Sequence, residues 1–309
     1  MSTESHQRRV FAARLFRTPV ERFDAIVDFP YQPKFREWQG LRLAHIDVGR
    51  GPIVLLLHGE PTWSYLWRKV IPPLVDAGFR CIAPDLAGFG RSDKPVEPAW
   101  YSYDNHTAVL LSLIDDLDLQ GVTLVMHDWG GPIGLRVAMI ERPERVNRLV
   151  VMDTGVFTGE QQMSDEWLRF RAFVAERPDV PIWPLIRGGC KTPPSAEVRA
   201  AYEAPFPNEA SKTGARRFPE LIPLDPEAPG ASEGRAVMQR LVRDQRPALV
   251  LWADADVVLP VESVGRPFQR LFRTADELTV IRDAGHFLQE DQGDQVGRVI
   301  GGWLTRQQR

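Results

Sequence analysis

Residues 121–135 read Gly-Val-Thr-Leu-Val-Met-His-Asp-Trp-Gly-Gly-Pro-Ile-Gly-Leu, a pattern that predicts a buried strand turning sharply into a helix. The apolar run at 122–126 suits a strand that is covered on both faces, and Gly130 with Gly131 allows strand and helix to pack closely. Asp128 lies at the turn, where a strained backbone exposes one side chain. Because a carboxylate is already charged at neutral pH, this side chain could act as a nucleophile without a base to remove a proton.

Composition narrows the class of protein. The chain has 309 residues, 43% of them hydrophobic and 26% charged, which is typical of a globular protein. Its net charge of −3 argues against a nucleic-acid or anionic-membrane binder. Cys81 and Cys190 make neither a disulfide framework nor a metal cluster, so we expect no metal. Residues 1–18 lack the apolar core of a secretory signal, and no run approaches ~18 apolar residues, so we expect a cytoplasmic protein with no membrane span.

Strand-like and helix-like patterns alternate along most of the chain. Residues 35–48 alternate like an antiparallel hairpin, and helical patterns follow at 65–74, 106–117, 133–140 and 295–304. Strands separated by helices imply a mostly parallel sheet with helices on both faces, an α/β fold. The apolar runs predicted to form the other strands are 53–57, 80–84, 122–126, 148–152, 248–252 and 278–281.

Residues 157–242 break this alternation. They contain no convincing buried strand, and short helical patterns occur at 167–175 and 196–201. A structureless connection of this length is rare in a compact domain, so we predict an inserted helical cap domain over the active-site face. The core domain would then comprise residues 1–156 and 243–309.

Asp128, Asp256 and His286 are the candidate catalytic residues. Each directly follows a predicted strand, at the edge of the sheet where ligands of open α/β sheets bind. Asp254 competes with Asp256 for the role of acid, and Asp256 is favoured as the last polar residue before an apolar run. Alone, Asp128 could be a helix N-cap and His286 a loop residue. Together, in the chain order nucleophile, acid, histidine, they predict the catalytic set of an α/β-hydrolase.

Residues 58–65, His-Gly-Glu-Pro-Thr-Trp-Ser-Tyr, follow the strand at 53–57 and supply a second element of such a site. The loop at this place contributes one backbone N–H of the oxyanion hole, which predicts Glu60 as a donor, with Trp129 as the other. Without that context the stretch is simply a turn that leads into a helix. His127, next to the nucleophile, is expected to point away from it and to be structural.

Several stretches spread over nearly the whole chain carry a resemblance to a known family. They are His58-Gly-Glu-Pro-Thr-Trp-Ser-Tyr65, Asp85-Leu-Ala-Gly-Phe-Gly-Arg-Ser-Asp-Lys-Pro95, His127-Asp-Trp-Gly-Gly131, Tyr202-Glu-Ala-Pro-Phe-Pro207 and Ala284-Gly-His-Phe-Leu-Gln-Glu290. With them the chain resembles the haloalkane dehalogenases of the α/β-hydrolase superfamily. The first and third stretches are fairly specific, whereas Gly-Phe-Gly-Arg-Ser is shared widely and supports the fold rather than the substrate.

The resemblance implies a two-step hydrolysis of a small apolar halogenated substrate, without cofactor or metal. The oligomeric state stays open, and a monomer is the simple expectation. Asp128 displaces halide from an alkyl carbon and forms an ester. His286, oriented by Asp256, then activates water that hydrolyses the ester. Indole N–H groups suit the departing halide because they are donors on large apolar rings, and Trp129 is the first such donor.

The second halide donor is where the sequence departs from the resemblance. A tryptophan would be expected from the cap, and one known position for it, counted back from residues 202–207, falls near Cys190. A thiol is a weak donor. Trp167 and Trp183 are the remaining cap tryptophans; Trp167 is preferred, although both could merely pack the cap. Candidates for the pocket wall, equally good as core residues, are Phe170, Phe173, Phe206 and Phe218.

Other functions stay open at this point. An epoxide hydrolase uses the same kind of triad but takes a pair of cap tyrosines, and Tyr202 is the only tyrosine in residues 157–242. A haloacetate dehalogenase would need arginines beside the nucleophile, where Trp129 stands, and an esterase or lipase would need serine in place of Asp128. A binding module that has lost catalysis, or a catalytically weak relative, is disfavoured by the complete triad and kept open by the missing donor.

Overall fold

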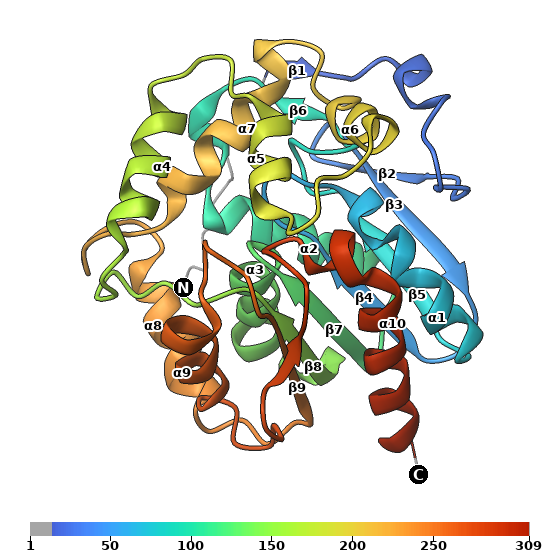
Figure 1. Ribbon diagram of the computed structural model, residues 1–309, viewed down its shortest axis with the longest axis vertical. Coiled ribbons are helices and arrows are strands. Elements are labelled where there is room, and N and C mark those ends of the chain that lie inside the picture. Colours follow the sequence, from blue (N-terminus) through green and yellow to red (C-terminus); the bar gives the residue numbers. More distant parts are fainter. Residues whose placement is uncertain (1–13, 309) are drawn as a thin grey trace, which may run out of the picture.

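The computed structural model describes residues 14–308 (Figure 1). Residues 1–13 lie outside that range, so most of the stretch assessed for a secretory signal and the start of the predicted core domain are not described. The main sheet has eight strands in the order β10-β9-β8-β7-β4-β5-β3-β2. Their bounds are β2 Lys34–Trp38, β3 Leu41–Gly49, β4 Ile53–Leu57, β5 Arg80–Pro84, β7 Val122–His127, β8 Val146–Met152, β9 Ala248–Ala253 and β10 Thr279–Ile281.

The sheet is mostly parallel, as the alternation of patterns predicts. β2 and β3 form the expected antiparallel hairpin, and β3 is also antiparallel to β5. From β5 to β10 every neighbouring pair is parallel. A separate pair of short strands joins β1, Leu15–Phe16, to β6, Lys94–Pro95. The parallel strands bring their carboxyl ends to one edge, which is where the candidate residues follow them.

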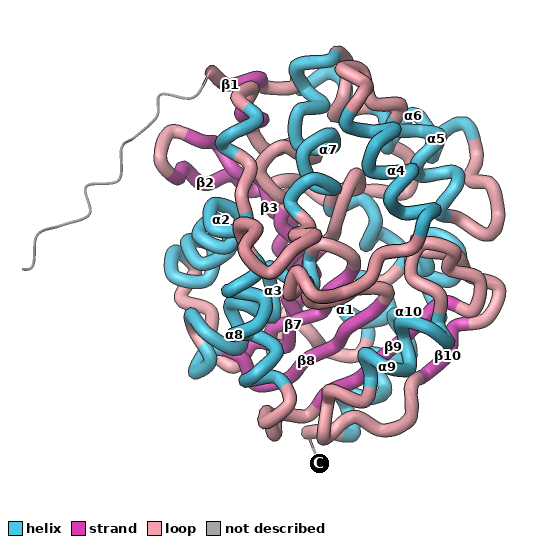
Figure 2. Tube along the Cα trace, turned by 90° about the vertical axis from the view of Figure 1, so that its left-hand side faces the viewer, coloured by secondary structure: helices cyan, strands magenta, loops and turns pink. Residues whose placement is uncertain are grey.

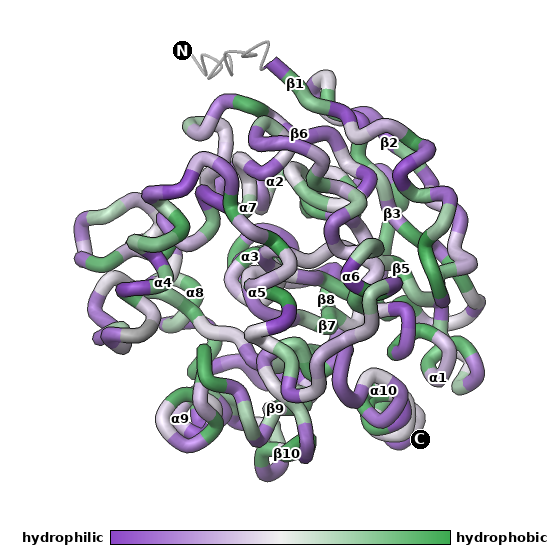
Figure 3. Tube along the Cα trace, turned by 45° about the horizontal axis from the view of Figure 1, so that its top comes forward, coloured by the Kyte–Doolittle hydropathy of each residue, from purple (hydrophilic) through white to green (hydrophobic). Residues whose placement is uncertain are grey.

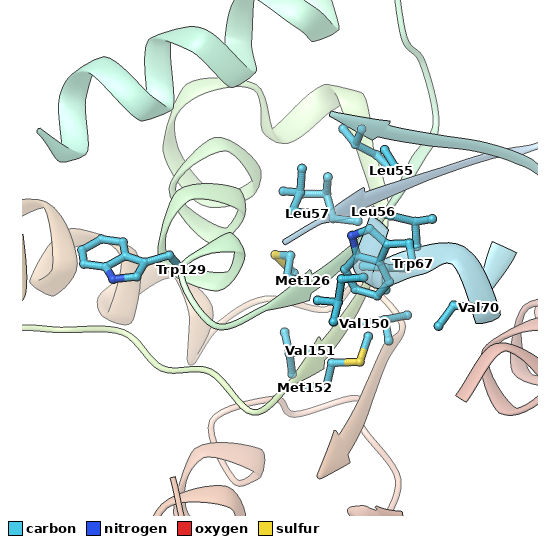
Figure 4. Packing of buried hydrophobic residues seen from close by; sticks show 14 of the residues in the cluster. Leu55, Leu56, Leu57, Trp67, Val70, Met126, Trp129, Val150, Val151 and Met152 are labelled. Carbon is cyan, nitrogen blue, oxygen red and sulfur yellow. The ribbon is translucent and has the colours of Figure 1, made fainter. Parts of the chain in front are cut away.

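The central strands form because they are apolar on both faces. Every residue of β7 and β9 is buried, and so is nearly every residue of β4 and β8. Figure 4 shows Leu57, Met126 and Val151 packed together between the strands, with the Trp129 ring standing apart from them. Trp129 is therefore buried outside this packed centre, at the end of β7.

Helices cover both faces of the sheet. Figure 2 shows α2 Tyr103–Asp116, α3 Gly130–Arg136 and α8 Ala231–Leu241 on one side, and α1 Ile71–Asp76 with α10 Leu288–Arg306 on the other. Hydrophobic and hydrophilic residues alternate along peripheral helices such as α10 (Figure 3), as in helices with one face on the core. The predicted mostly parallel sheet with helices on both faces is confirmed. No helix within residues 14–308 is long and apolar enough to cross a membrane.

Shorter helical turns connect these elements. A further short α-helix outside the inserted segment, α9, spans Arg266–Gln269. The 3₁₀ turns are η1 Val20–Phe23, η2 Ser64–Lys69, η3 Pro98–Trp100, η5 Pro143–Arg145, η6 Glu209–Lys212 and η7 Phe218–Leu221, and the π turns are η4 Val137–Glu141 and η8 Val261–Gly265.

Residues 157–242, the inserted segment, are helical. Residues 153–247 are described throughout and contain no strand. Helices α4 Asp165–Ala175, α5 Ile182–Gly189, α6 Ala196–Glu203 and α7 Thr213–Arg217 gather at the top of Figure 1. The last helix of the segment, α8, instead packs against α3 in the layer beside the sheet. The division into core and cap domains therefore stays a prediction.

A buried ion pair ties the inserted segment to the core. The Arg68 guanidinium donates to both Glu290 carboxylate oxygens, at 2.6 and 2.5 Å, and the Tyr202 hydroxyl of α6 donates to Glu290 Oε2 at 2.9 Å. Burial alone would raise the pKa of Glu290, but Arg68 and Lys69 bring it below its usual value. The Glu290 carboxylate of α10 thus binds side chains from both η2 and α6.

We expect Glu290→Gln to lower the free energy of unfolding by about 3–5 kcal/mol, because Arg68 would be left buried without its counter-ion. Urea unfolding at pH 7 measures this. The matched control is Glu262→Gln, whose exposed pair with Arg266 should be worth no more than about 0.5 kcal/mol. Since the folded-state pKa of Glu290 is lowered, its contribution is present above the unfolded pKa and is lost as the pH falls through the folded one. Equal effects of the two variants would contradict this account.

Candidate active site

Asp128 occupies a strained turn between β7 and α3. Its φ is +48°, in the left-handed region that non-glycine residues seldom adopt. A Cβ on Gly130 would lie 2.3 Å from the Leu57 carbonyl oxygen, so only glycine allows the helix to start this close to β4. The Thr154 hydroxyl donates to the Asp128 carbonyl at 2.6 Å and holds the turn from behind. The predicted sharp turn is present, and it presents the Asp128 carboxylate at the sheet edge.

The structure brings Asp128, His286 and Asp256 together. His286 Nδ1 lies 2.8 Å from Asp256 Oδ2, and His286 Nε2 lies 3.6 Å from Asp128 Oδ2. Asp256 Oδ1 also accepts backbone N–H groups from Val258 and Leu259 at 2.7 and 3.0 Å. These contacts lock the Asp256 carboxylate toward one side of the imidazole, with Asp128 on the other.

Asp254, the competing acid, takes a different place. Its Oδ1 accepts the Ala284 backbone N–H at 3.2 Å, and its own N–H donates to the Ile281 carbonyl at 3.0 Å. Asp254 therefore braces the loop after β10, whereas Asp256 contacts the His286 ring.

Charge in this cluster favours an ionised pair of carboxylates around a protonated histidine. Burial alone would raise the pKa of Asp256, but His286 brings it well below the usual value. Burial likewise opposes charge on Asp128, yet His286 lowers the pKa of Asp128. Burial would lower the pKa of His286, and the two carboxylates raise it well above its usual value instead. The resting site thus holds imidazolium between two carboxylates.

The two backbone N–H groups predicted for an oxyanion hole both meet Asp128. Glu60 N–H donates to Asp128 Oδ1 at 2.7 Å, and Trp129 N–H also donates to the Asp128 carboxylate. The Glu60 side chain is buried beside the site, and burial together with the Asp128 charge raises its pKa well above the usual value. Burial therefore favours the neutral form of the Glu60 carboxyl group.

Comparison with known proteins places this site in a family. A family model described as the alpha/beta hydrolase fold matches residues 52–292. The chain is 40% identical to a haloalkane dehalogenase from Psychrobacter cryohalolentis over 297 residues, which cover 93% of this chain and 97% of the relative. A haloalkane dehalogenase from Mycolicibacterium paratuberculosis is 38% identical over 306 residues, covering 94% and 98%. The chain belongs to the haloalkane dehalogenase family.

A solved structure agrees with this assignment. Haloalkane dehalogenase DpaA from Paraglaciecola agarilytica, described as tetrameric, superposes with a TM-score of 0.86 at 35% identity and covers 93% of this chain and 97% of its own. The haloalkane dehalogenase fold thus extends over the sheet, its helices and the inserted segment.

For a haloalkane dehalogenase, the surroundings of Trp129 matter most. The Phe218 ring packs edge-on against Trp129 at a centroid distance of 5.1 Å, and Phe157 approaches to 6.1 Å. A narrow cavity borders Trp129, and Leu221 and Pro223 are among its lining residues. Among the contacts of residues 14–308 no hydrogen bond of the Trp129 indole N–H is found, and neither Asp128 nor His286 lines this cavity.

The candidate wall residues separate into different environments. Phe218 lies against Trp129, and Phe206 is buried against Phe89. Phe173 was a wrong candidate: it is 37% exposed and Arg177 stacks on its ring at 3.6 Å, because this side of α4 faces solvent. Phe170 is half-buried against the core cluster.

The cap tryptophans also differ. Trp167, near the start of α4, is buried in the main core cluster. Trp183 is half-buried against the core cluster and lies under Arg199, 5.9 Å from its ring, and Arg199 pairs with Glu203 at the surface. Cys190 ends α5, half-buried. Neither Trp167 nor Trp183 is among the residues that line the cavity beside Trp129, so the second halide donor stays a prediction.

His127 and Asp153 are polar groups behind the catalytic set. Burial lowers the pKa of His127 to about 3, so the ring is neutral, and its Nε2 lies 2.8 Å from the His286 carbonyl oxygen. Asp153, fully buried after β8, was missed by sequence reasoning, although it follows an apolar strand just as Asp128 and Asp256 do. Among the described residues no group of His, Cys, Asp and Glu side chains could hold a metal ion.

Proposed function

We propose that this chain hydrolyses small apolar haloalkanes to an alcohol and a halide, with Asp128 as nucleophile, His286 as base and Asp256 as the acid that orients His286. The observation that supports this proposal most strongly is the position of the Asp128 carboxylate. Asp128 lies on a strained turn, its Oδ1 accepts the Glu60 N–H, and its Oδ2 lies 3.6 Å from His286 Nε2. Family membership supports an enzyme acting on carbon–halide bonds.

In the first step Asp128 attacks the carbon that carries the halogen. Oδ1 is held by the Glu60 N–H, so Oδ2 is the freer oxygen and forms the new C–O bond. The electron pair of the breaking C–X bond leaves with the halide. The product of this step is a neutral alkyl ester of Asp128 and a halide ion beside the Trp129 indole.

In the second step His286 becomes the base. Esterification removes the negative charge of Asp128, which helped to hold the proton on His286, so the pKa of His286 falls. His286 releases its proton to solvent, which accounts for the acid formed with the halide, and the neutral imidazole then takes a proton from water, which attacks Cγ of Asp128. The negative charge that develops on Oδ1 is stabilised by the N–H groups of Glu60 and Trp129. Collapse breaks the bond from Cγ to Oδ2, and His286 returns its proton to Oδ2, which leaves as the alcohol. The carboxylic acid of Asp128 then passes its proton to His286, which restores the carboxylate and the imidazolium.

We assign the halide to Trp129 and Trp167. Trp129→Phe and Trp167→Phe should each slow halide release from 1-bromobutane about a hundredfold, because loss of one charge-stabilising donor costs ~3 kcal/mol. Trp183→Phe is the matched control and should change nothing, since Trp183 lies under the exposed Arg199. Steady-state halide release measures all three. A loss in Trp183→Phe with none in Trp167→Phe would reverse this assignment.

Halide release from 1-bromobutane, 1,2-dibromoethane and 1-iodobutane, assayed beside styrene oxide hydrolysis, tests the proposed reaction. We expect halide from the haloalkanes and no diol from the epoxide. Opening an epoxide would need a cap tyrosine to protonate its oxygen, and the hydroxyl of Tyr202, the one tyrosine of residues 157–242, already donates a hydrogen bond to Glu290. Diol without halide would support an epoxide hydrolase instead. If the protein released no halide and formed no diol, a binding module without catalysis would be favoured.

We further propose that the protein works as a cytoplasmic monomer. Cys81 and Cys190 are both free thiols, which fits a reducing compartment such as the cytoplasm. Size-exclusion chromatography with light scattering tests the oligomeric state, and a tetramer would match the description of DpaA.

A further inference from the structure

We propose that Asp153 is a positioning residue that keeps a proton and donates it in a hydrogen bond to Asp256, so that one buried residue fixes both the triad acid and the nucleophile turn. The inference rests on the proposed function of Asp128, Asp256 and His286. Asp153 touches no reacting atom and would act through Asp256 and Asp128.

Asp153 lies where its backbone and its side chain reach different members of the site. It directly follows β8, has a φ of +40° and exposes none of its surface. Its backbone carbonyl accepts the Asp128 N–H at 3.2 Å, and its neighbour Thr154 donates to the Asp128 carbonyl. Its side chain accepts the Ala253 N–H at the end of β9, at 3.2 and 3.3 Å, three residues before Asp256, with which it shares a hydrogen bond. The same turn therefore braces the nucleophile and the acid.

The donors around the two carboxyl groups decide which of them is charged. Asp256 receives His286 Nδ1 at 2.8 Å and the N–H groups of Val258 and Leu259 at 2.7 and 3.0 Å. Asp153 receives only the Ala253 N–H, shared between its oxygens at 3.2 and 3.3 Å. Since two buried carboxylates in contact cannot both ionise easily, the negative charge belongs on Asp256 and the proton on Asp153.

The electrostatic surroundings agree with this assignment. Burial, followed by the charge of Asp256, raises the pKa of Asp153 well above its usual value. The other titratable groups that face the pair are His286 after β10 and, from the β7 turn, Asp128 and neutral His127. Only His286 brings positive charge, and it is already bonded to Asp256. A protonated Asp153 is then an O–H donor to the Asp256 carboxylate.

A retained proton on Asp153 has a consequence for His286. A second carboxylate beside Asp256 would raise the pKa of His286 and hold a proton on it after Asp128 has been esterified. With the proton on Asp153 instead, His286 is neutral in the ester state and can activate water. Ester hydrolysis, and not halide release in the first turnover, therefore depends on the Asp153 proton.

Two isosteric variants test the proposal. Asp153→Asn keeps a donor to Asp256 but cannot ionise, and Asp153→Leu keeps the volume but has no donor. We expect Asn to retain activity within about threefold at pH 7.5, because it donates to Asp256 and leaves a single negative charge beside His286. Leu should slow ester hydrolysis at least about tenfold with the first-turnover halide burst unchanged, because a charge-assisted hydrogen bond to Asp256 is lost. An intact burst shows that the Leu variant folds.

Infrared spectroscopy at pH 7.5 separates this proposal from the proposed function, because it needs no turnover. Wild type should show one more protonated-carboxyl band than Asp153→Asn, whether or not the chain releases halide. An unchanged band pattern would overturn the assignment of the proton. So would an Asn variant as slow as the Leu variant, which would mean that the ionised carboxylate is required, or a Leu variant as fast as wild type.

Discussion

Asp128→Ala should release halide from 1-bromobutane at least about 10,000-fold more slowly than wild type, because removing a covalent nucleophile abolishes the step on which the rest depends. The turn itself should survive the change. Its φ of +48° strains alanine as it strains aspartate, and Thr154 still bonds the backbone carbonyl. Halide release followed over hours, with enzyme in excess over substrate, gives the required sensitivity.

Asp254→Ala is the control for this experiment. Asp254 bonds the loop after β10 and does not contact His286, so turnover should stay within a few-fold of wild type. If Asp128→Ala kept substantial halide release, the carboxylate would not be the nucleophile, and a direct attack by water would have to replace the ester mechanism.

His286→Gln should have the second largest effect on turnover. It should block hydrolysis of the ester and leave the first step, halide release, possible. Asp128 is charged without help from a base, so the variant should release about one halide per active site in a burst. Turnover should then stop, because no base activates the water. The alkylated enzyme should accumulate and appear in intact-protein mass spectrometry as a mass increase equal to the alkyl group.

The burst depends on Asp128 staying ionised without the imidazolium. Burial opposes that charge, so the burst is expected to be slower than the wild-type first turnover. Steady turnover near the wild-type rate would show that another group serves as base, and the absence of any burst would show that His286 takes part in the attack on carbon.

The sheet could be predicted closely because its strands have no competing interpretation. β4, β5, β7 and β8 are short apolar runs between turn residues, and two-sided burial is what such runs need. Helices were harder. α5 carries Pro184, Gly188 and Gly189, which disfavour a helix, and it forms because Ile182 and Ile186 bury one face.

The long helix α10 shows how a local break hides a helix start. The pattern predicted only residues 295–304, whereas the helix begins at Leu288. Gln292 has non-helical angles, φ −131° and ψ 33°, and separates a short first piece whose polar residues serve the site. Glu290 and Asp291 in that piece are buried or bonded to loops, so no amphipathic pattern marks it.

Positions at the sheet edge could be read from the sequence, and contacts between helices could not. Asp128, Asp256 and His286 each follow a strand, and parallel strands bring such residues to one edge. Asp153 also follows an apolar strand, but it was not selected as a candidate. Its contact with Asp256, which is distant in sequence, shows its role only in the folded protein. The choice between Trp167 and Trp183 depends on how α4 and α6 pack, which no local pattern encodes.

The ester at Asp128 is the central claim, and the origin of the product oxygen tests it most directly. Enzyme in excess over 1-bromobutane, in water enriched in ¹⁸O, would complete a single turnover. The account predicts that the butanol carries ordinary oxygen taken from Asp128 Oδ2, and that the peptide containing Asp128 gains one ¹⁸O. Butanol labelled with ¹⁸O in that first turnover, over an unlabelled Asp128, would contradict it.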